Sequence, residues 1–433
     1  MEPKKIMVAL LLLPMTLLSQ EVLTLEEAVK TALANNYDIR IAANELRIDS
    51  TQVTIGNAGF LPRVEAIATD NNSIQNSSQT RQTGEVITLD NARNNSLNYG
   101  VNLGWTIFDG FGMFARYDQL KETRKLGEAE LRVAMTAGIG DLMGTYFDLV
   151  QQQQQLAALD TAIVISRQRV ETAQNRYTIG KAAKLEVLNA QVDLNTDITA
   201  QLRQQETFAT SRVRLNELMG RDPQVQFRVS DSITVDSSLV LADLINRASE
   251  QNPQIQAQVL SKRIAELQLR QVRAGRYPVV TVNTGYIFTE SESSLGFTTE
   301  ASSRGFSYGF NATLNLFDGF NQRRNEKVAK LQVENADLFI ERQKLAIGSQ
   351  VTSAYQTYLA NVSLIDIERR NQELAKENLR ITLDKFRIGT VPTLEFRTAQ
   401  LNYINARARF YNAQYQAKLS EITLRELSGS LGL

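Results

Sequence analysis

Two stretches of the chain alternate apolar and polar residues with a period of two. One runs from Asn98 to Ile107 and the other from Phe306 to Leu316, with small polar residues or glycine between the apolar ones. A period of two with one apolar face predicts β-strands. The apolar positions are Tyr99, Val101, Leu103, Trp105 and Ile107 in the first stretch and Phe306, Tyr308, Phe310, Ala312, Leu314 and Leu316 in the second.

Each of these strands is expected to pair with an earlier one, around Val64–Ala68 and Val280–Phe288, through the polar loops Asn71–Ser96 and Glu290–Gly305. The face opposite the apolar one carries Gly, Ser, Asn and Thr rather than charged residues. Strands of about ten residues with such faces suit a transmembrane β-barrel. One half-buried sheet of a soluble sandwich is the alternative interpretation.

The remaining pattern is helical. Gly112–Asn175 and Asn321–Asp384 contain no proline and carry apolar residues every seven positions, which predicts long helices wound into coiled coils. The heptad positions are Leu142, Leu149, Leu156, Ile163, Val170 and Tyr177, then Val351, Tyr358, Ile365, Gln372, Leu379 and Phe386, where Gln372 is the one polar interruption. A further seam runs through Ile367, Leu374, Ile381 and Ile388. The shorter helices are expected at Thr24–Ala58, Lys184–Met219, Ala242–Ala274 and Thr393–Ser428.

The chain contains two copies of one plan. Pro62 returns as Pro278, 216 residues later, and Phe108-Asp109-Gly110-Phe111 returns as Phe317-Asp318-Gly319-Phe320, 209 residues later. Duplication at a fixed shift is typical of a tandem repeat. We therefore expect an α+β protein with repeat 1 at residues 21–219, a linker at 220–238 and repeat 2 at 239–433, each with a helix, a β-hairpin, a long helix and a further helix.

The first twenty residues are set apart from this plan. Lys4 and Lys5 precede an apolar run from Ile6 to Leu18, followed by the polar Ser19 and Gln20. The run is too short to span a bilayer as a helix. Residues 1–20 are therefore interpreted as a cleaved signal peptide for export, with an uncleaved anchor as the alternative and the exact cleavage site open.

The amino-acid composition excludes several kinds of active site and argues against nucleic-acid binding. The chain has no Cys and no His, which excludes thiol nucleophiles, Ser-His-Asp triads and ordinary zinc sites. Equal numbers of basic and acidic residues, 47 each, argue against nucleic-acid binding. Asp109 and Asp318 look like paired carboxylates, but their place between a strand and a helix favours turn and capping roles. No cofactor, metal or catalytic residue is expected, and an enzyme is the least favoured class.

Four strands raise a problem of closure. The smallest single-chain transmembrane barrels have eight strands, and open sheet edges are not tolerated in hydrocarbon. If the strands span a membrane, several copies of the chain must share one barrel.

The whole mature chain resembles the TolC family of bacterial outer-membrane efflux proteins. The resemblance rests on the duplication, on Leu23-Thr24-Leu25-Glu26-Glu27-Ala28, on Phe-Asp-Gly-Phe, and on Tyr-Thr-Ile-Gly and Phe-Arg-Ile-Gly, each followed six residues later by an acid. It implies a homotrimer with a shared twelve-strand barrel in outer-membrane lipid, continued by a helical periplasmic tunnel. The implied role is a passive exit duct for efflux or type I secretion, docked to a periplasmic adaptor and an inner-membrane pump of the RND or ABC type.

Gly180 and Gly389 interrupt the coiled-coil sequence, and glycine there permits the left-handed end of a helix. Pro392 suits the first turn of the returning helix. A helical-hairpin turn is the simple interpretation. The resemblance implies that these turns form the tip that the adaptor grips, through Ile179, Gly180, Lys181, Ile388, Gly389 and Thr390.

Glu186 and Glu395 follow the two turns. An acid near a helix N-terminus stabilises the helix dipole. The resemblance also implies a ring of carboxylates at the closed tunnel entrance, which would favour cations. The sequence departs from the family pattern at Phe386, Val391 and Thr398, where a Tyr, an Arg and a second acid are expected. How the closed gate is latched is therefore left open.

Tyr99, Trp105, Tyr308 and Phe310 fit an aromatic girdle facing the membrane, with ordinary strand packing as the alternative. A surface coiled-coil fibre is the second candidate function, although it would not explain two matched hairpins. The cargo stays open between drugs, lipophilic compounds and secreted polypeptides.

Overall fold

The computed structural model describes residues 22–230, 232–294 and 298–431. The predicted signal peptide lies outside the described residues. Contacts divide the chain into two compact units, of which the first combines residues 1–41, 132–252 and 346–433, and the second combines 42–131 and 253–345. Both repeats contribute to each unit.

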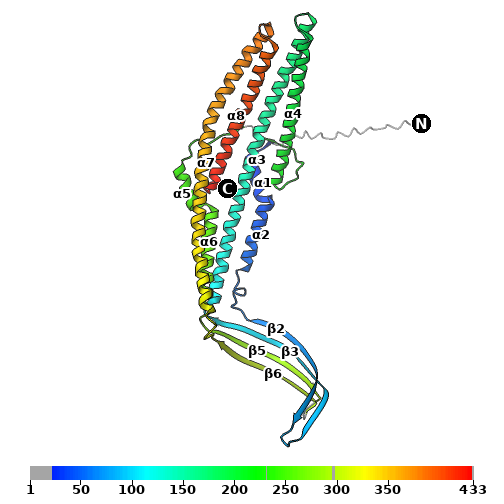
Figure 1. The fold of residues 1–433 in the computed structure, drawn as a ribbon, viewed down its shortest axis with the longest axis vertical. Helices are drawn as coiled ribbons and strands as arrows, with labels where there is room; N and C mark the ends of the chain where they lie inside the picture. Colours follow the sequence, from blue (N-terminus) through cyan, green and yellow to red (C-terminus); the bar gives the residue numbers. More distant parts are fainter. Residues whose placement is uncertain (1–21, 231, 295–297, 432–433) are drawn as a thin grey trace, which may run out of the picture. The chain divides into compact units, whose positions relative to one another are not determined.

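The second unit contains an antiparallel sheet in the order β2-β3-β5-β6 (Figure 1). Its strands are β2 (Arg63–Thr80), β3 (Val86–Asp109), β5 (Val279–Ser293) and β6 (Glu300–Thr313). Each repeat supplies one hairpin, and β3 of repeat 1 pairs with β5 of repeat 2. Within the described residues, β2 and β6 are the edges of the sheet.

The prediction of polar loops at residues 71–96 and 290–305 was wrong. The β2–β3 ladder continues from Arg63 opposite Gly104 to Thr80 opposite Val86, and β5 and β6 pair as far as Glu292 opposite Glu300. Polar side chains do not prevent a ladder whose hydrogen bonds come from the backbone. The loss of alternation showed that neither face is apolar there, and it was misread as the end of the strands.

The long helices were predicted correctly. They are α3 (Gly112–Thr178) with α4 (Lys184–Leu218), and α7 (Asn321–Ile388) with α8 (Thr393–Leu427), forming two helical hairpins in Figure 1. The heptad residues Leu142, Leu149, Val351 and Tyr358 are buried, as expected. The further seam on α7 is exposed in the single chain.

The two shorter N-terminal helices of the repeats are each broken, which corrects the prediction of continuous helices. Repeat 1 has α1 (Leu25–Asn35) and α2 (Tyr37–Gln52), and repeat 2 has α5 (Leu241–Gln251) and α6 (Pro253–Ala274). Asn36 at the first break accepts a hydrogen bond from the backbone N–H of Asp38 (2.9 Å) and donates to the Leu218 carbonyl (2.8 Å). The repeat equivalent, Asn252, donates to the Leu427 carbonyl (2.9 Å). An asparagine that caps the next helix thus ends the first one.

The main core lies in the first unit. Leu142, Tyr146, Leu149 and Leu215 are buried there beside a two-stranded parallel sheet of β1 (Val22–Leu23) and β4 (Arg228–Val229). The helices of the described ranges include none that is both long enough and apolar enough to cross a bilayer.

Candidate functional site

The sheet has one apolar and one polar face. Cross-strand pairs such as Trp105 opposite Val282 and Val282 opposite Phe310 place the apolar side chains of all four strands on the same side. Tyr308 and Phe310 on the edge strand are 83% and 80% exposed. The apolar face consists of Val64, Ala66, Ala68, Tyr99, Val101, Leu103, Trp105, Val282, Thr284, Tyr286, Phe288, Phe306, Tyr308, Phe310 and Ala312.

The four aromatics that the sequence singled out all lie on this face. The Tyr99 ring stacks on Phe288 at 5.0 Å and its hydroxyl donates to Glu290 at 3.1 Å. The Trp105 indole nitrogen donates to the Phe60 carbonyl at 2.8 Å. Rings that pack with one side and use their polar atom at the end are suited to the boundary between lipid and water.

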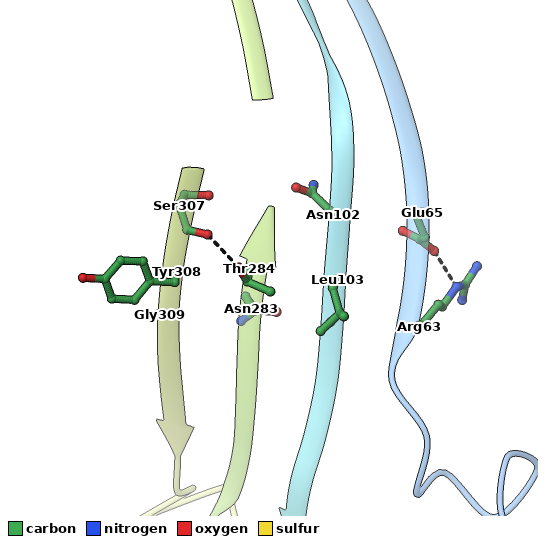
Figure 2. A pocket seen from close by; sticks show the side chains of 10 residues that line it. Arg63, Glu65, Asn102, Leu103, Asn283, Thr284, Ser307, Tyr308 and Gly309 are labelled. Atoms are coloured by element: carbon green, nitrogen blue, oxygen red, sulfur yellow. Dashed lines mark hydrogen bonds and ion pairs between the residues drawn. The ribbon is translucent and has the colours of Figure 1, made fainter. Parts of the chain in front are cut away.

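The opposite face is hollowed into a cavity of about 550 Å³ (Figure 2). Asn102, Asn283 and Ser307 line it together with the Arg63–Glu65 ion pair, whose closest atoms are 2.5 Å apart. Small and polar residues leave this face open and wettable, although Arg63 and Glu65 correct the expectation that it carries no charged residues. The sheet therefore has the two surfaces required of a wall between an apolar medium and water.

Between the strands and the long helices that follow them, both Phe-Asp-Gly-Phe segments form turns. Asp109 accepts a hydrogen bond from the Met113 backbone N–H (3.0 Å), and Asp318 accepts one from the Gln322 backbone N–H (2.7 Å). The expected capping role of these aspartates is confirmed.

The far ends of the helical hairpins turn at Gly180 and Gly389, whose φ angles are 75° and 85°. The backbone N–H of Lys181 donates to the Arg176 carbonyl (2.8 Å), and that of Thr390 donates to the Lys385 carbonyl (3.0 Å). This pattern satisfies the last carbonyls of a helix. The left-handed glycines expected from the sequence are confirmed. Pro392 is the N-cap residue of α8, one position before the first turn in which it was predicted, and its side chain makes no capping hydrogen bond.

The two turns expose large apolar side chains. Ile179 and Ile388 are 65% and 76% exposed, and Leu185 and Leu394 on the returning helices are 65% and 77% exposed. The four side chains are related in pairs by the repeat. Such residues are costly in water, so this surface is suited to contact with another protein.

The two predicted gate acids have different surroundings. Glu186, in the first turn of α4, is half-buried and accepts a hydrogen bond from the Thr393 hydroxyl (3.1 Å) of the other hairpin. Glu395, in the first turn of α8, is exposed. The Glu395 carboxylate is therefore exposed to solvent in the single chain, whereas Glu186 is tied to the neighbouring turn.

A buried ionic cluster close to the turns escaped the sequence analysis. Arg397 on α8 donates two hydrogen bonds of 2.9 Å to Asp197 on α4 and lies 3.5 Å from Asp193. Arg169 on α3 pairs with Asp193, and the Ser166 hydroxyl donates to Asp197. The available signal was a set of charged residues of both signs within apolar stripes, such as Asp197 in line with Val187 and Ala190 on α4.

A second contact joins the hairpins at the site of the family departures. The Arg176 side chain donates to the Phe386 carbonyl, and its guanidinium carbon lies 4.8 Å from the centre of the Phe386 ring. That ring is buried and stacks on Phe396 at 5.0 Å. Phe386 is thus held through its backbone and its ring face without the hydroxyl of a Tyr. Val391 is also buried, and the Thr398 hydroxyl donates to the Leu394 carbonyl (3.0 Å).

No convergent group of three acidic or other metal-binding side chains occurs among residues 22–230, 232–294 and 298–431.

Residues 28–221 and 244–430 match the sequence model of the family described as outer membrane efflux protein. Protein CyaE of Bordetella pertussis is 25% identical over 417 residues, which cover 95% of this chain and 85% of the relative. Outer membrane protein TolC of Vibrio cholerae is 20% identical over 413 residues, covering 94% of this chain and 91% of the relative.

Solved structures share the fold. The outer-membrane channel OprN superposes with a TM-score of 0.76 at 19% identity, covering 94% of this chain and 90% of that chain. The Campylobacter jejuni CmeC outer membrane channel gives a TM-score of 0.76 at 19% identity, covering 94% and 85%. The chain belongs to the TolC-like outer membrane efflux protein family and is an outer-membrane protein of bacterial export.

Proposed function

We propose that three copies of the chain form one passive exit duct across the outer membrane. The observation that carries the proposal is the sheet of β2, β3, β5 and β6, which has one apolar face, one polar face and two edges. Its alternating apolar positions on β3 run over nine residues, from Tyr99 to Ile107. A tilted strand needs about 9–11 residues to cross an outer membrane.

Closure needs neighbouring copies, because an open edge is not tolerated in lipid. Three copies of four strands give twelve. Each repeat contributes one β-hairpin to this barrel wall. Repeat 1 is residues 21–219, repeat 2 is residues 239–433, and the linker 220–238 joins them.

The helices offer matching surfaces for such an assembly. On α7, Ile367, Leu374 and Ile381 are 54%, 71% and 41% exposed at seven-residue spacing. On α4, Leu188, Val192 and Leu202 are 48%, 63% and 59% exposed. Heptad stripes of this kind pack against other helices. In the proposed duct they join adjacent copies into a periplasmic tunnel.

The tip residues Ile179, Gly180, Lys181, Ile388, Gly389 and Thr390 are the proposed docking surface for a periplasmic adaptor. The exposed isoleucines supply apolar contact, and Lys181 supplies charge at the rim. The adaptor links the duct to an inner-membrane pump of the RND or ABC type, which supplies the energy. Docking separates the hairpins and widens the entrance, where Glu395 lies, with Glu186 beside it.

Conductance in planar bilayers tests the duct directly. Purified protein is expected to give stepwise ion currents, and deletion of its gene is expected to abolish one export activity. A surface fibre would give neither result. Protein that inserts into vesicles without conducting would overturn the proposal.

The docking surface has its own test. Ile388→Asp places a charge in the apolar contact and should reduce adaptor cross-linking and export, while conductance of the purified channel persists. Ile367→Asp, on the α7 seam away from the turn, is the matched control and should instead weaken assembly. Equal adaptor cross-linking by the Ile388 variant and the parent would remove the tip from the contact.

A further inference from the structure

A second cavity, of about 710 Å³, lies in the first unit. Its lining comes from α3, α4, the linker at residues 220–238 and α8, so both repeats contribute to it. The lining includes no residue of the four-stranded sheet or of the two glycine turns. The volume is within the usual range of sites for small molecules.

The lining of this cavity is rich in positive charge. It contains Arg212, Arg228 and Arg407, together with the acid Asp160. The Asp160 carboxylate accepts a hydrogen bond from the side-chain amide of Gln201. In the described part of the chain, Arg212 and Arg407 form no ion pair with an acidic side chain. The cavity thus carries excess positive charge in a chain whose formal net charge is zero.

Arg212 and Arg407 are both held against aromatic rings. The guanidinium carbon of Arg212 lies 5.7 Å from the centre of the Phe208 ring, and that of Arg407 lies 5.5 Å from the centre of the Tyr411 ring. Arg407 also donates from Nε to the Tyr411 hydroxyl (2.9 Å). Ring contacts of this kind fix the plane of a guanidinium. The terminal N–H groups can then form a two-bond contact with a carboxylate or phosphate.

The Arg212 guanidinium is partly removed from water without a compensating charge. Partial burial lowers the pKa of Arg212, and no carboxylate of the described residues opposes this effect. An arginine keeps its charge even so. Because a buried charge is favourable only when it is paired, an anion that enters the cavity would stabilise this side chain.

An apolar surface borders the arginines. Leu156, Phe208 and Phe227 line the same cavity. Phe227 is buried in the main core of the first unit, and Phe208 packs against that core. These rings are therefore held in place before any ligand binds, and they offer contact to the apolar part of a molecule whose charged part meets the arginines.

The two repeats differ at these positions. At the shift of 209 residues, Arg212 corresponds to Glu421 and Arg407 corresponds to Ile198. Glu421 is 2% exposed and forms an ion pair of 2.9 Å with Lys418. Residues that the shared fold requires recur in both copies, as the asparagines that end α1 and α5 do. The arginines of the cavity do not recur, which favours a role other than support of the fold.

We propose that this cavity binds a small, soluble organic anion, in which a carboxylate or phosphate group is joined to an aromatic or aliphatic body. The anionic group is held by Arg212 and Arg407, and the apolar body lies against Phe208 and Phe227. The bound anion connects α4 of repeat 1 to α8 of repeat 2. The site is separate from the membrane-facing aromatics, the docking turns and the gate acids of the proposed duct.

Phenyl phosphate is the probe, titrated by calorimetry into the full-length protein in a non-ionic detergent. One saturable site per chain is expected, together with a raised midpoint of thermal unfolding, because the ligand binds the folded chain. Inorganic phosphate carries the charge without the ring and should bind about tenfold more weakly. Benzyl alcohol carries the ring without the charge and should show no saturable binding.

Substitutions of the arginines test the assigned contacts. Arg212→Gln combined with Arg407→Gln removes both charges and should weaken phenyl phosphate binding by about tenfold or more. Arg212→Lys keeps the charge without the planar fork and should give an intermediate affinity. Arg203→Gln, on the exposed surface of α4 outside the cavity, is the matched control and should bind as the parent does.

Two results would overturn the site: no saturable binding of phenyl phosphate to the parent, or equal affinity of the parent and the double variant. Equal affinities for phenyl phosphate and inorganic phosphate would overturn the contact with the rings. Saturable binding of benzyl alcohol would overturn the requirement for an anion. None of these measurements depends on conductance, so a failure here leaves the proposed duct intact.

Discussion

The guanidinium of Arg397 and the carboxylate of Asp197 form a buried, two-bond ion pair that joins α8 of repeat 2 to α4 of repeat 1. Both hydrogen bonds are 2.9 Å long, and the two side chains are 8% and 7% exposed. Around this pair, Arg169 and Asp193 add a second ion pair. Any widening of the tip that separates the hairpins must break these contacts, so they oppose opening.

Asp197→Ala is expected to destabilise the protein by up to about 3–5 kcal/mol, because it leaves the buried Arg397 charge with only the 3.5 Å contact to Asp193, which Arg169 already shares. Thermal unfolding and leak conductance should both report the loss. Asp197→Leu combined with Arg397→Met should recover most of the stability, since it removes both charges. The exposed Arg380–Glu377 pair is the control, and Arg380→Ala should change neither measurement. A single Asp197 variant as stable as the parent would show that the ion pair does not hold the hairpins.

Arg176→Ala should loosen the end of α7, because it removes the hydrogen bond to the Phe386 carbonyl and the cation above the Phe386 ring. Amide hydrogen exchange around residues 383–390 is expected to accelerate, and leak conductance to rise. Arg176→Lys keeps the charge without the planar fork and should have an intermediate effect. Unchanged exchange in the alanine variant would contradict a latch at Phe386.

Stability should depend on pH through Asp148. Burial raises the pKa of the Asp148 carboxyl, partly offset by hydrogen bonds from Ser211 and Gln152. A raised folded-state pKa means that this contribution is fully present below the unfolded pKa and is lost as pH rises through the folded pKa. Asp148→Asn should therefore stabilise the protein at pH 7, and the gain should shrink toward about pH 4, near the ordinary pKa of Asp.

In the Asp148→Asn variant, the new side-chain amide can also donate to the buried Gln152 Oε1, which has no hydrogen-bond partner among the described atoms. This hydrogen bond to a buried acceptor should raise the free energy of unfolding by about 1 kcal/mol. The measurement is the unfolding midpoint of parent and variant across this pH range. A gain that grows as pH falls would contradict the assigned sign.

Gly180→Ala should destabilise the tip by about 1–2 kcal/mol, because a side chain at its φ angle of 75° is strained. Gly348→Ala is the matched control within α7. A Cβ at either position meets no described atom within 4 Å, so the comparison isolates the backbone. Alanine should stabilise the helix at 348 by about 1 kcal/mol. Denaturant unfolding should give opposite signs, and equal effects would contradict a left-handed turn.

Glu395→Gln should weaken the cation preference of the open channel and its block by multivalent cations. The reason is that three exposed carboxylates at one constriction attract cations, and the amide removes the charge without changing the shape. Glu377→Gln, on the exposed surface of α7, should leave selectivity unchanged. Unaltered single-channel selectivity in the Glu395 variant would remove this residue from the gate.

The sequence predicted the family, the α+β duplicated plan and the long helices, because heptads and a repeat at a constant shift are properties of spacing alone. The prediction failed where the polarity of the side chains does not report the conformation of the backbone. Asn71–Ser96 was assigned to a loop although most of it is strand, since a ladder with two polar faces has no alternation to detect. The breaks at Asn36 and Asn252 were missed although asparagine favours N-caps over helix interiors and Pro253 directly follows the second break.

At the candidate site, the turns at Gly180 and Gly389 followed from local sequence, since left-handed glycine and Pro392 act within a few residues. The Arg397–Asp197 pair did not, because its partners are 200 residues apart and only the packing of α8 on α4 brings them together. The roles of Glu186 and Glu395, the adaptor contact and the membrane-facing aromatics remain predictions.

The mass of the detergent-extracted particle tests the central claim most directly, because a four-stranded sheet with two edges cannot seal itself in lipid. Native mass spectrometry should give particles of three chains. When tagged and untagged chains are mixed during expression, the particles should carry zero, one, two or three tags. A particle containing one chain, stable in water without detergent, would contradict the shared barrel.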